Sequence, residues 1–171
     1  MSDVKLLSPI IQHWEGKFSN DPLDSGGATM MGITLRTYKA YCKIKGKPEP
    51  KVWDLANIQP DEWDEVLKKM YWDKWQADQI NNQSIANILV DWVWASGAWG
   101  IKIPQRILHL TEDGIVGYQT LYAVNTANQR GLFQDIKQAR ERFVWDIVAA
   151  KPDQKKFING WLNRINSFTF A

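Results

Sequence analysis

One glutamate near the start of the chain combines features that acid-catalysed cleavage of a sugar bond requires. Glu15 lies near the end of an apolar, helix-like segment, stands between Trp14 and Phe18, and precedes a loop rich in Gly, Asp and Ser. In glycoside hydrolysis a carboxylic acid must keep its proton until it meets the leaving oxygen. A partly apolar setting and the negative end of a helix dipole both favour the protonated form. Glu15 is therefore the candidate general acid.

The loop after Glu15 offers a second carboxylate and two hydroxyl groups. Asp24 stands nine residues later and could stabilise a cationic transition state or orient a water. The loop's glycines let a polymer approach the backbone, and Thr29 and Thr34 could position a water or bind a sugar hydroxyl. A simpler interpretation stays open, because most glutamates near helix ends are solvated and an aspartate before Ser-Gly-Gly commonly forms a turn.

The composition limits other kinds of site and partner. Cys42 is the only cysteine among 171 residues, which excludes an internal disulfide and metal sites built on paired cysteines. Asp21 does not begin a calcium loop, because the twelfth residue from it is Gly32 where a glutamate is required. The net charge is +2 and the basic residues are scattered, so nucleic acid is a poor partner. We expect a monomer with no metal and no cofactor.

The sequence predicts no membrane-spanning segment and no signal peptide for export. No apolar run approaches the ~20 residues that span a bilayer, and the first 14 residues lack the apolar core of a signal peptide. A protein of this kind that acts on a cell wall is expected to reach it after release or by a non-standard route.

The rest of the chain must supply the scaffold, and its apolar periodicity is helical. Spacings of three and four residues between apolar side chains predict several helices. They cover the first segment up to Phe18 and residues of about 35–45, 60–70, 83–96, 101–110, 132–147 and 157–168. Pro104 is expected to begin or kink its helix. Residues 19–32 and 111–117 have loop composition, the first with room for a short hairpin, so the expected fold class is mainly α.

The order of these motifs resembles the glycoside hydrolase family 108 lysozymes, which are N-acetylmuramidases. The stretch from Glu15 to Thr34 resembles that family's N-terminal signature, and the similarity covers nearly the whole chain. Further matching motifs are YWD (71–73), DWVWASG (91–97), DGIVG (113–117) and GWLNR (160–164). The resemblance implies a lysozyme-like helical fold. It also implies a muramidase region over residues 1–97 and a predicted peptidoglycan-binding region over 98–171, packed together as one unit.

The resemblance also implies a reaction and a set of site residues. The reaction is hydrolysis of the β-1,4 bond between N-acetylmuramic acid and N-acetylglucosamine, with Glu15 as the acid and with Asp24 and Thr29 beside it. Trp72, Asp91 and Ser96 are further candidates to line the cleft. Trp72 could stack on a sugar face, and Asp91 lies in an apolar run where a carboxylate needs polar partners, which favours a polar site there.

Two positions depart from the family pattern. Lys17 and Phe18 stand where the family has glycine and tyrosine. A cation near Glu15 favours its charged form and so opposes the acid role, and Phe18 lacks a phenol hydrogen bond. These changes keep one alternative open, a protein that binds the cell wall or a partner without cutting. A second alternative is a lytic transglycosylase, in which one glutamate serves as acid and then as base and leaves an anhydro sugar end.

Overall fold

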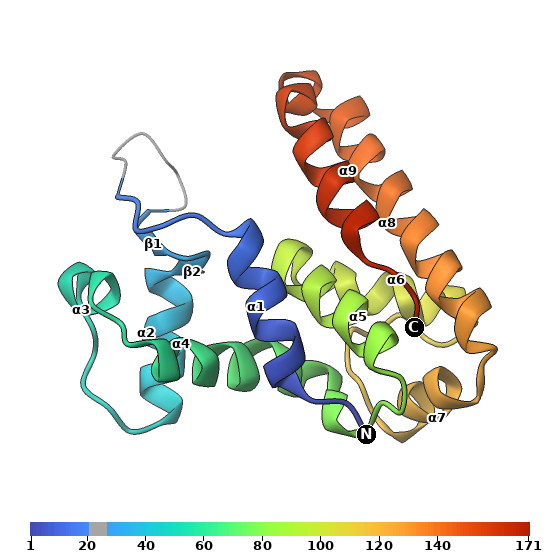
Figure 1. Ribbon diagram of the computed structural model, residues 1–171, viewed down its shortest axis with the longest axis horizontal. Coiled ribbons are helices and arrows are strands. Elements are labelled where there is room, and N and C mark those ends of the chain that lie inside the picture. The colour runs from blue at the N-terminus through green and yellow to red at the C-terminus, as the bar shows by residue number, and fades with distance from the viewer. Residues whose placement is uncertain (21–26) are drawn as a thin grey trace. The chain divides into compact units, whose positions relative to one another are not determined.

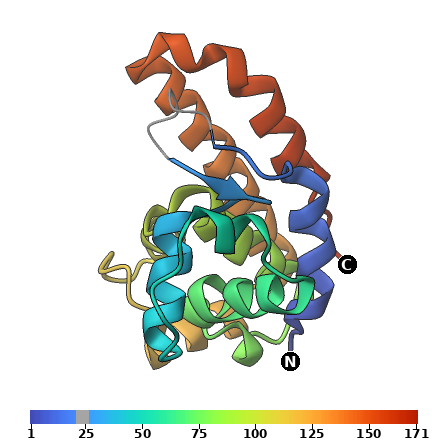
Figure 2. The ribbon, with the colours of Figure 1, turned by 90° about the vertical axis from the view of Figure 1, so that its left-hand side faces the viewer.

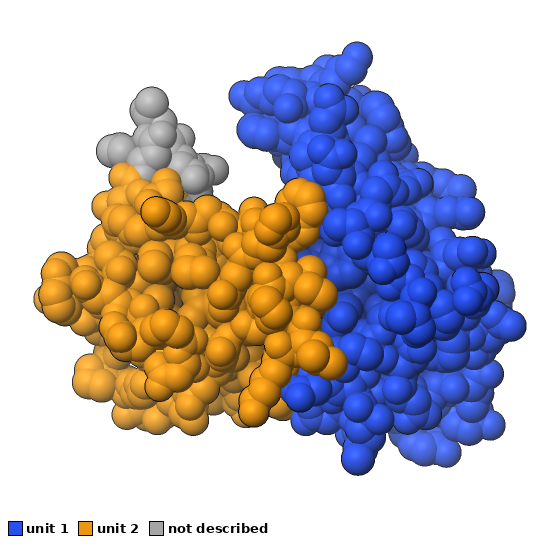
Figure 3. Space-filling model, in the orientation of Figure 1, with its two compact units in different colours: residues 1–3, 74–171 blue, residues 4–73 orange. Residues whose placement is uncertain are grey.

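The computed structural model describes residues 1–20 and 27–171, so Asp24 lies outside the described residues. Within these ranges the chain is mainly helical, with nine α-helices and a two-stranded hairpin (Figure 1). This confirms the expected fold class. The helices pack into two compact units, coloured separately in Figure 3: unit 2 holds residues 4–73, and unit 1 holds residues 1–3 and 74–171.

Unit 2 is built around one central helix. Its elements are α1 (Val4–Trp14), β1 (Thr29–Met30), β2 (Ile33–Thr34), α2 (Leu35–Ile44), α3 (Val52–Ala56), α4 (Pro60–Leu67) and the π-helical turn η1 (Lys68–Trp72). Helix α4 contacts both α1 and α2, which flank it in Figure 2, and its Trp63, Val66 and Leu67 side chains are buried. Pro60 opens α4 as predicted, because its fixed φ suits a first helical turn.

Helix α1 ends earlier than its apolar spacing predicts. The pattern continues to Phe18, but the helix stops at Trp14 and the Phe18 ring is 38% exposed. The reason lies just beyond, where Ser19 pairs with Thr29 as an antiparallel bridge. The chain therefore leaves the helix after Trp14 and is extended by Ser19.

Unit 1 contains the remaining helices around a buried one. They are η2 (Asp73–Trp75, whose first residue belongs to unit 2), η3 (Ala77–Gln79), α5 (Gln83–Ser96), α6 (Trp99–Ile107), α7 (Tyr118–Thr126), α8 (Gln129–Ala150), η4 (Pro152–Phe157) and α9 (Ile158–Ser167). Helix α5 is buried through most of its length and packs against α6 and α8, while α8 and α9 lie side by side (Figure 1). Packing therefore divides the chain between Asp73 and Lys74, whereas the sequence predicts a boundary between residues 97 and 98.

Helix α6 carries a proline in its interior. Pro104 does not begin the helix, which starts at Trp99. The carbonyl of Gly100, which lies one turn before the proline, accepts a hydrogen bond from Trp75 Nε1 at 3.2 Å. That carbonyl would otherwise lack the partner that proline cannot supply. A Cβ at Gly100 would come within 2.5 Å of the Val93 nitrogen, so glycine is required where α5 and α6 meet.

The sequence does not predict α3 or α7. Both are short, and α7 leaves Tyr118 and Tyr122 exposed, which blurs its apolar face. No described helix combines the length and apolar character needed to cross a membrane.

Candidate active site

Glu15 stands where α1 stops, in unit 2. Its N–H donates to the Ile11 carbonyl at 3.1 Å, so Glu15 is the last residue that the helical hydrogen bonds hold. The helix is anchored by the fully buried Leu7 and Ile11 and by a hydrogen bond from Ser8 to Asp64 on α4. The Glu15 side chain is half-buried. A fixed backbone therefore presents a partly accessible carboxyl group.

The hairpin that follows is tied to the segment just beyond Glu15. The backbones of Ser19 and Thr29 exchange two hydrogen bonds of 2.8 Å each, and Thr29 pairs in turn with Thr34 across the hairpin. The turn residues Met31 and Gly32 have φ of 47° and 84°, the mirror-image turn that suits twisted strands. Positive φ is unfavourable for methionine, but Trp63 Nε1 donates to its carbonyl at 3.2 Å and ties this turn to α4.

Two threonines at the start of α2 form a chain of hydroxyl groups. Thr34 caps the helix, because its Oγ1 accepts from the Thr37 N–H at 3.1 Å. The same hydroxyl donates to Thr37 Oγ1, also at 3.1 Å. The predicted site residue Thr34 therefore acts as a helix cap, and its hydroxyl also positions the Thr37 hydroxyl by a hydrogen bond. Thr29 and Thr34 are both half-buried.

Tyr71 joins this chain of hydroxyls to the glutamate. It lies on η1, and its phenol makes a hydrogen bond with the Thr37 side chain. Burial raises the pKa of Tyr71, the Thr37 hydrogen bond opposes that rise, and the nearby Glu15 carboxylate adds to it. The charge of Glu15 therefore reaches the phenol. The sequence offers Tyr71 only as the first residue of the YWD motif and does not single it out as a site residue. That motif is the one signal in the sequence that points to it.

This arrangement gives the carboxyl group a polar neighbour that stays neutral. A tyrosine phenol with its ordinary pKa of 10.0 is already protonated at neutral pH, and the raised pKa of Tyr71 extends that range. The phenol can therefore donate a hydrogen bond to a sugar oxygen or to a carboxylate. A π-helical turn inserts a residue into a helix and is frequent at functional sites, which fits the position of Tyr71. Glu15, Tyr71 and Thr37 together are the candidate active site. Among the described residues, no three His, Cys, Asp or Glu side chains gather in a way that could hold a metal ion.

Trp72 does not take the position that the sequence predicts. Its side chain is fully buried, as are Trp63 and Trp75 on either side of it in the chain. A buried ring cannot stack on a sugar, so the expected role of Trp72 as a stacking platform is wrong in this structure. Its position next to Tyr71 makes it a packing residue that holds η1 in place.

Asp91 lies in unit 1 and is completely buried. Its Oδ2 accepts from Arg140 Nη2 at 3.0 Å, and its Oδ1 accepts from Arg164 Nη2 at 2.7 Å. Polar partners are thus present, as a carboxylate in an apolar run requires, but they are protein side chains that tie α5 to α8 and α9. Asp91 is engaged in joining three helices rather than being presented to a substrate.

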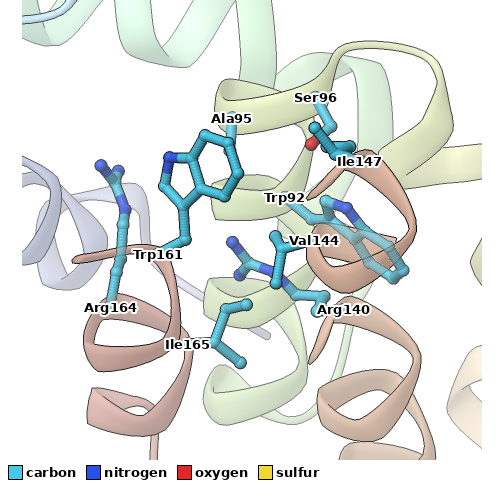
Figure 4. A pocket seen from close by; sticks show the side chains of 9 residues that line it. All are labelled: Trp92, Ala95, Ser96, Arg140, Val144, Ile147, Trp161, Arg164 and Ile165. Carbon is cyan, nitrogen blue, oxygen red and sulfur yellow. The ribbon is translucent and has the colours of Figure 1, made fainter. Parts of the chain in front are cut away.

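Ser96 lines a small cavity in unit 1. The cavity holds about 130 Å³, and Figure 4 shows its walls, which come from α5, α8 and α9. Trp92, Trp161 and Ile165 form apolar sides, while Arg140 and Arg164 bring the cationic groups that bind Asp91. Ser96 is half-buried at this cavity.

The two departures from the family pattern both lie at the surface. Lys17 and Phe18 are exposed, and Lys17 is not among the residues with positive φ. A side chain at position 17 therefore carries no left-handed strain. Its charge is screened by solvent, which weakens the opposition to the acid role that the sequence predicts.

Two protein families match the sequence, one over each half of it. The family described as Glycosyl hydrolase 108 matches residues 8–97, and the one described as Predicted Peptidoglycan domain matches residues 99–166. Among solved structures, the chain is similar to the structure of Brucella abortus SagA. The two share 22% sequence identity and a TM-score of 0.76, over 96% of this chain and 94% of that one. No curated protein matches the chain.

Proposed function

The chain belongs to the glycosyl hydrolase 108 family, and from this premise we propose that it is an N-acetylmuramidase with Glu15 as its general acid. Its substrate is the β-1,4 bond between N-acetylmuramic acid and N-acetylglucosamine in peptidoglycan. Family membership makes it a glycoside hydrolase, and the match to a predicted peptidoglycan domain accounts for the choice of polymer. The protein acts on the glycan strands of the bacterial cell wall.

The observation that carries the proposal is the position of Glu15 directly after α1, half-buried and close enough to Tyr71 for its charge to raise the pKa of the phenol. A general acid needs a fixed backbone, partial shielding from water and polar neighbours that bind the substrate. Glu15 has a backbone held by α1, a half-buried side chain, and a neutral phenol within reach of its charge. Tyr71 serves as a positioning residue, which orders the carboxyl group and the sugar oxygen it protonates.

The second carboxylate in this mechanism is Asp24. Its role rests on the sequence motif, because it lies outside the described residues. Glu15 donates its proton to the leaving oxygen as the glycosidic bond breaks, and Asp24 stabilises the cationic sugar or orients the water that attacks it. Thr29, beside the Ser19 bridge, is available to a sugar hydroxyl.

Mass spectrometry of the products tests this reaction. Peptidoglycan digested by the protein should yield fragments with reducing N-acetylmuramic acid ends, each carrying the mass of one added water. Anhydro ends would show lytic transglycosylase chemistry, and reducing N-acetylglucosamine ends would show that the other glycosidic bond is cut. Intact glycan strands that pellet with the protein would favour a binding protein that does not cut. Each of these three results would overturn the muramidase assignment.

A further inference from the structure

A surface groove in unit 1 lies between α6 and α8. It has a volume of about 580 Å³, within the range of small-molecule sites in proteins. Its wall is apolar, with Ile103 and Ile107 from α6 and Ile147 from α8, and it is bordered by Trp99 and Phe143. The residues that line the groove belong to unit 1, whereas Glu15 belongs to unit 2.

Trp99 is an exposed ring held in a fixed position. Its side chain is 49% exposed, although the chain fully buries four other tryptophans. The Phe143 ring lies 6.5 Å from the Trp99 ring, and the Lys102 ammonium lies 5.4 Å over it. These contacts restrict the ring and place the ammonium over one of its faces, while about half of the side chain stays exposed. A half-exposed indole, pre-positioned at a groove, is suited to stack on a flat apolar face.

The rim of the groove supplies both hydrogen-bond donors and acceptors. Arg142 and Asp146 are exposed, lie one turn apart on α8 and both line the groove. On the α6 side Arg106 makes an exposed ion pair with Glu112 at 2.7 Å. The groove therefore places a guanidinium and a carboxylate next to isoleucine side chains and an indole.

We propose that this groove binds an N-acetylated amino sugar of a glycan strand, with Trp99 as the stacking residue. Such a sugar has one apolar C–H face for the indole, an acetyl methyl for the isoleucines, and hydroxyl and amide groups for Arg142 and Asp146. The inference rests on the proposed function, because that function identifies peptidoglycan as the polymer. The groove is then the surface by which the predicted peptidoglycan-binding region contacts a glycan strand. A groove of this kind holds the strand independently of its cleavage at Glu15.

Nuclear magnetic resonance of the indole N–H groups can test the groove directly. The Glu15→Gln protein, which keeps the sugar intact, is titrated with a β-1,4 tetramer of N-acetylglucosamine and separately with the glucose tetramer of the same linkage. The chain has ten tryptophans, and the Trp99 signal is identified by its loss in Trp99→Ala. Trp14, next to Glu15, reports on the catalytic site. Trp145→Ala is a matched control, because that side chain is 48% exposed on α8 but does not line the groove.

The groove predicts a saturable shift of the Trp99 signal with the acetylated tetramer and a shift at least tenfold weaker with the glucose tetramer. Trp99→Ala should weaken binding to stem-free glycan strands about tenfold, and Trp145→Ala should leave it within twofold. A shift of Trp14 alone would overturn the groove while supporting the proposed function. A Trp99 shift that depends on protein concentration rather than on sugar would assign the groove to a second copy and overturn the inference. No shift at either residue, and no binding to peptidoglycan, would overturn both proposals.

Discussion

The carboxylate of Glu15 lies close enough to the Tyr71 phenol to raise its pKa, although the two residues come from different elements. Glu15 directly follows α1, whereas Tyr71 lies on the π-helical turn η1, and its phenol makes a hydrogen bond with Thr37 at the start of α2. Three segments of unit 2 thus meet at one candidate site.

Tyr71→Phe keeps the ring and removes only the hydroxyl group. We expect kcat to fall about five- to tenfold, because one hydrogen bond contributes roughly 1 kcal/mol. The pH–activity profile should change with it, since the phenol interacts with the charge of Glu15. Tyr118→Phe is the control, because Tyr118 is 79% exposed on α7 in unit 1. Equal profiles for Tyr71→Phe and wild type would remove Tyr71 from the site.

Asp24→Asn should lower kcat by roughly a factor of ten or more, and by less than the loss of the acid, since general acid–base contributions are ~10²–10⁴. Asp21→Asn, in the same loop, is the control and should retain activity. The measurement is the initial rate on purified peptidoglycan with both variants shown to be folded by circular dichroism. Wild-type rates for Asp24→Asn would exclude Asp24 from the mechanism.

Asp91→Ala should destabilise the protein strongly without any direct effect on the chemistry at Glu15. Removing the carboxylate leaves Arg140 and Arg164 as like charges in the interior, and breaking a buried ion pair costs about 3–5 kcal/mol. Urea unfolding measures the loss, with the exposed Asp135→Asn on α8 as control. A loss below about 1 kcal/mol would show that the network is not a structural tie.

Alkaline pH should destabilise unit 2 through two buried tyrosines. Burial and hydrogen bonds to Glu62 and Glu65 raise the pKa of Tyr38 and of Tyr41 above their ordinary value of 10.0. The folded protein then keeps protons that the unfolded chain loses, so their contribution is complete below pH 10 and falls as pH rises above it. Each tyrosine adds up to about 1.4 kcal/mol per pH unit to the decrease in the free energy of unfolding.

Urea unfolding between pH 9 and 11 should therefore show a falling free energy of unfolding for wild type. Tyr41→Phe should flatten that fall, whereas Tyr122→Phe, which changes an exposed ring, should not. The same slope in Tyr41→Phe and wild type would contradict the assignment.

Local signals in the sequence were sufficient for several helices. The α5 helix runs from Gln83 to Ser96 as predicted, because Asn82 caps its start and Gly97, with φ of 61°, ends it. The sequence also predicts Glu15 near a helix end, because the apolar spacing gives way to a loop rich in Gly, Asp and Ser soon after it. The wrong extension to Phe18 arose because spacing does not reveal the Ser19–Thr29 bridge.

The spacing of apolar residues does not predict which side chains far apart in the sequence bind each other. The partners of Asp91 are 49 and 73 residues away in the chain, so the sequence could indicate that a buried carboxylate needs partners but not which ones. Tyr71 and Trp72 are neighbours in the YWD motif, and the sequence favours Trp72 because an indole can stack on a sugar face. Its complete burial depends on packing between elements, which the motif does not reveal.

The central claim is that Glu15 is the proton donor, and loss of turbidity of a peptidoglycan suspension tests it most directly. Wild type, Glu15→Gln and the control Glu49→Gln, which changes an exposed glutamate of the same unit, are compared at equal concentration after circular dichroism has confirmed their folds. We predict that wild type and Glu49→Gln clear the suspension and that Glu15→Gln is slower by at least a factor of about 100. Clearance by Glu15→Gln at the wild-type rate would contradict the account.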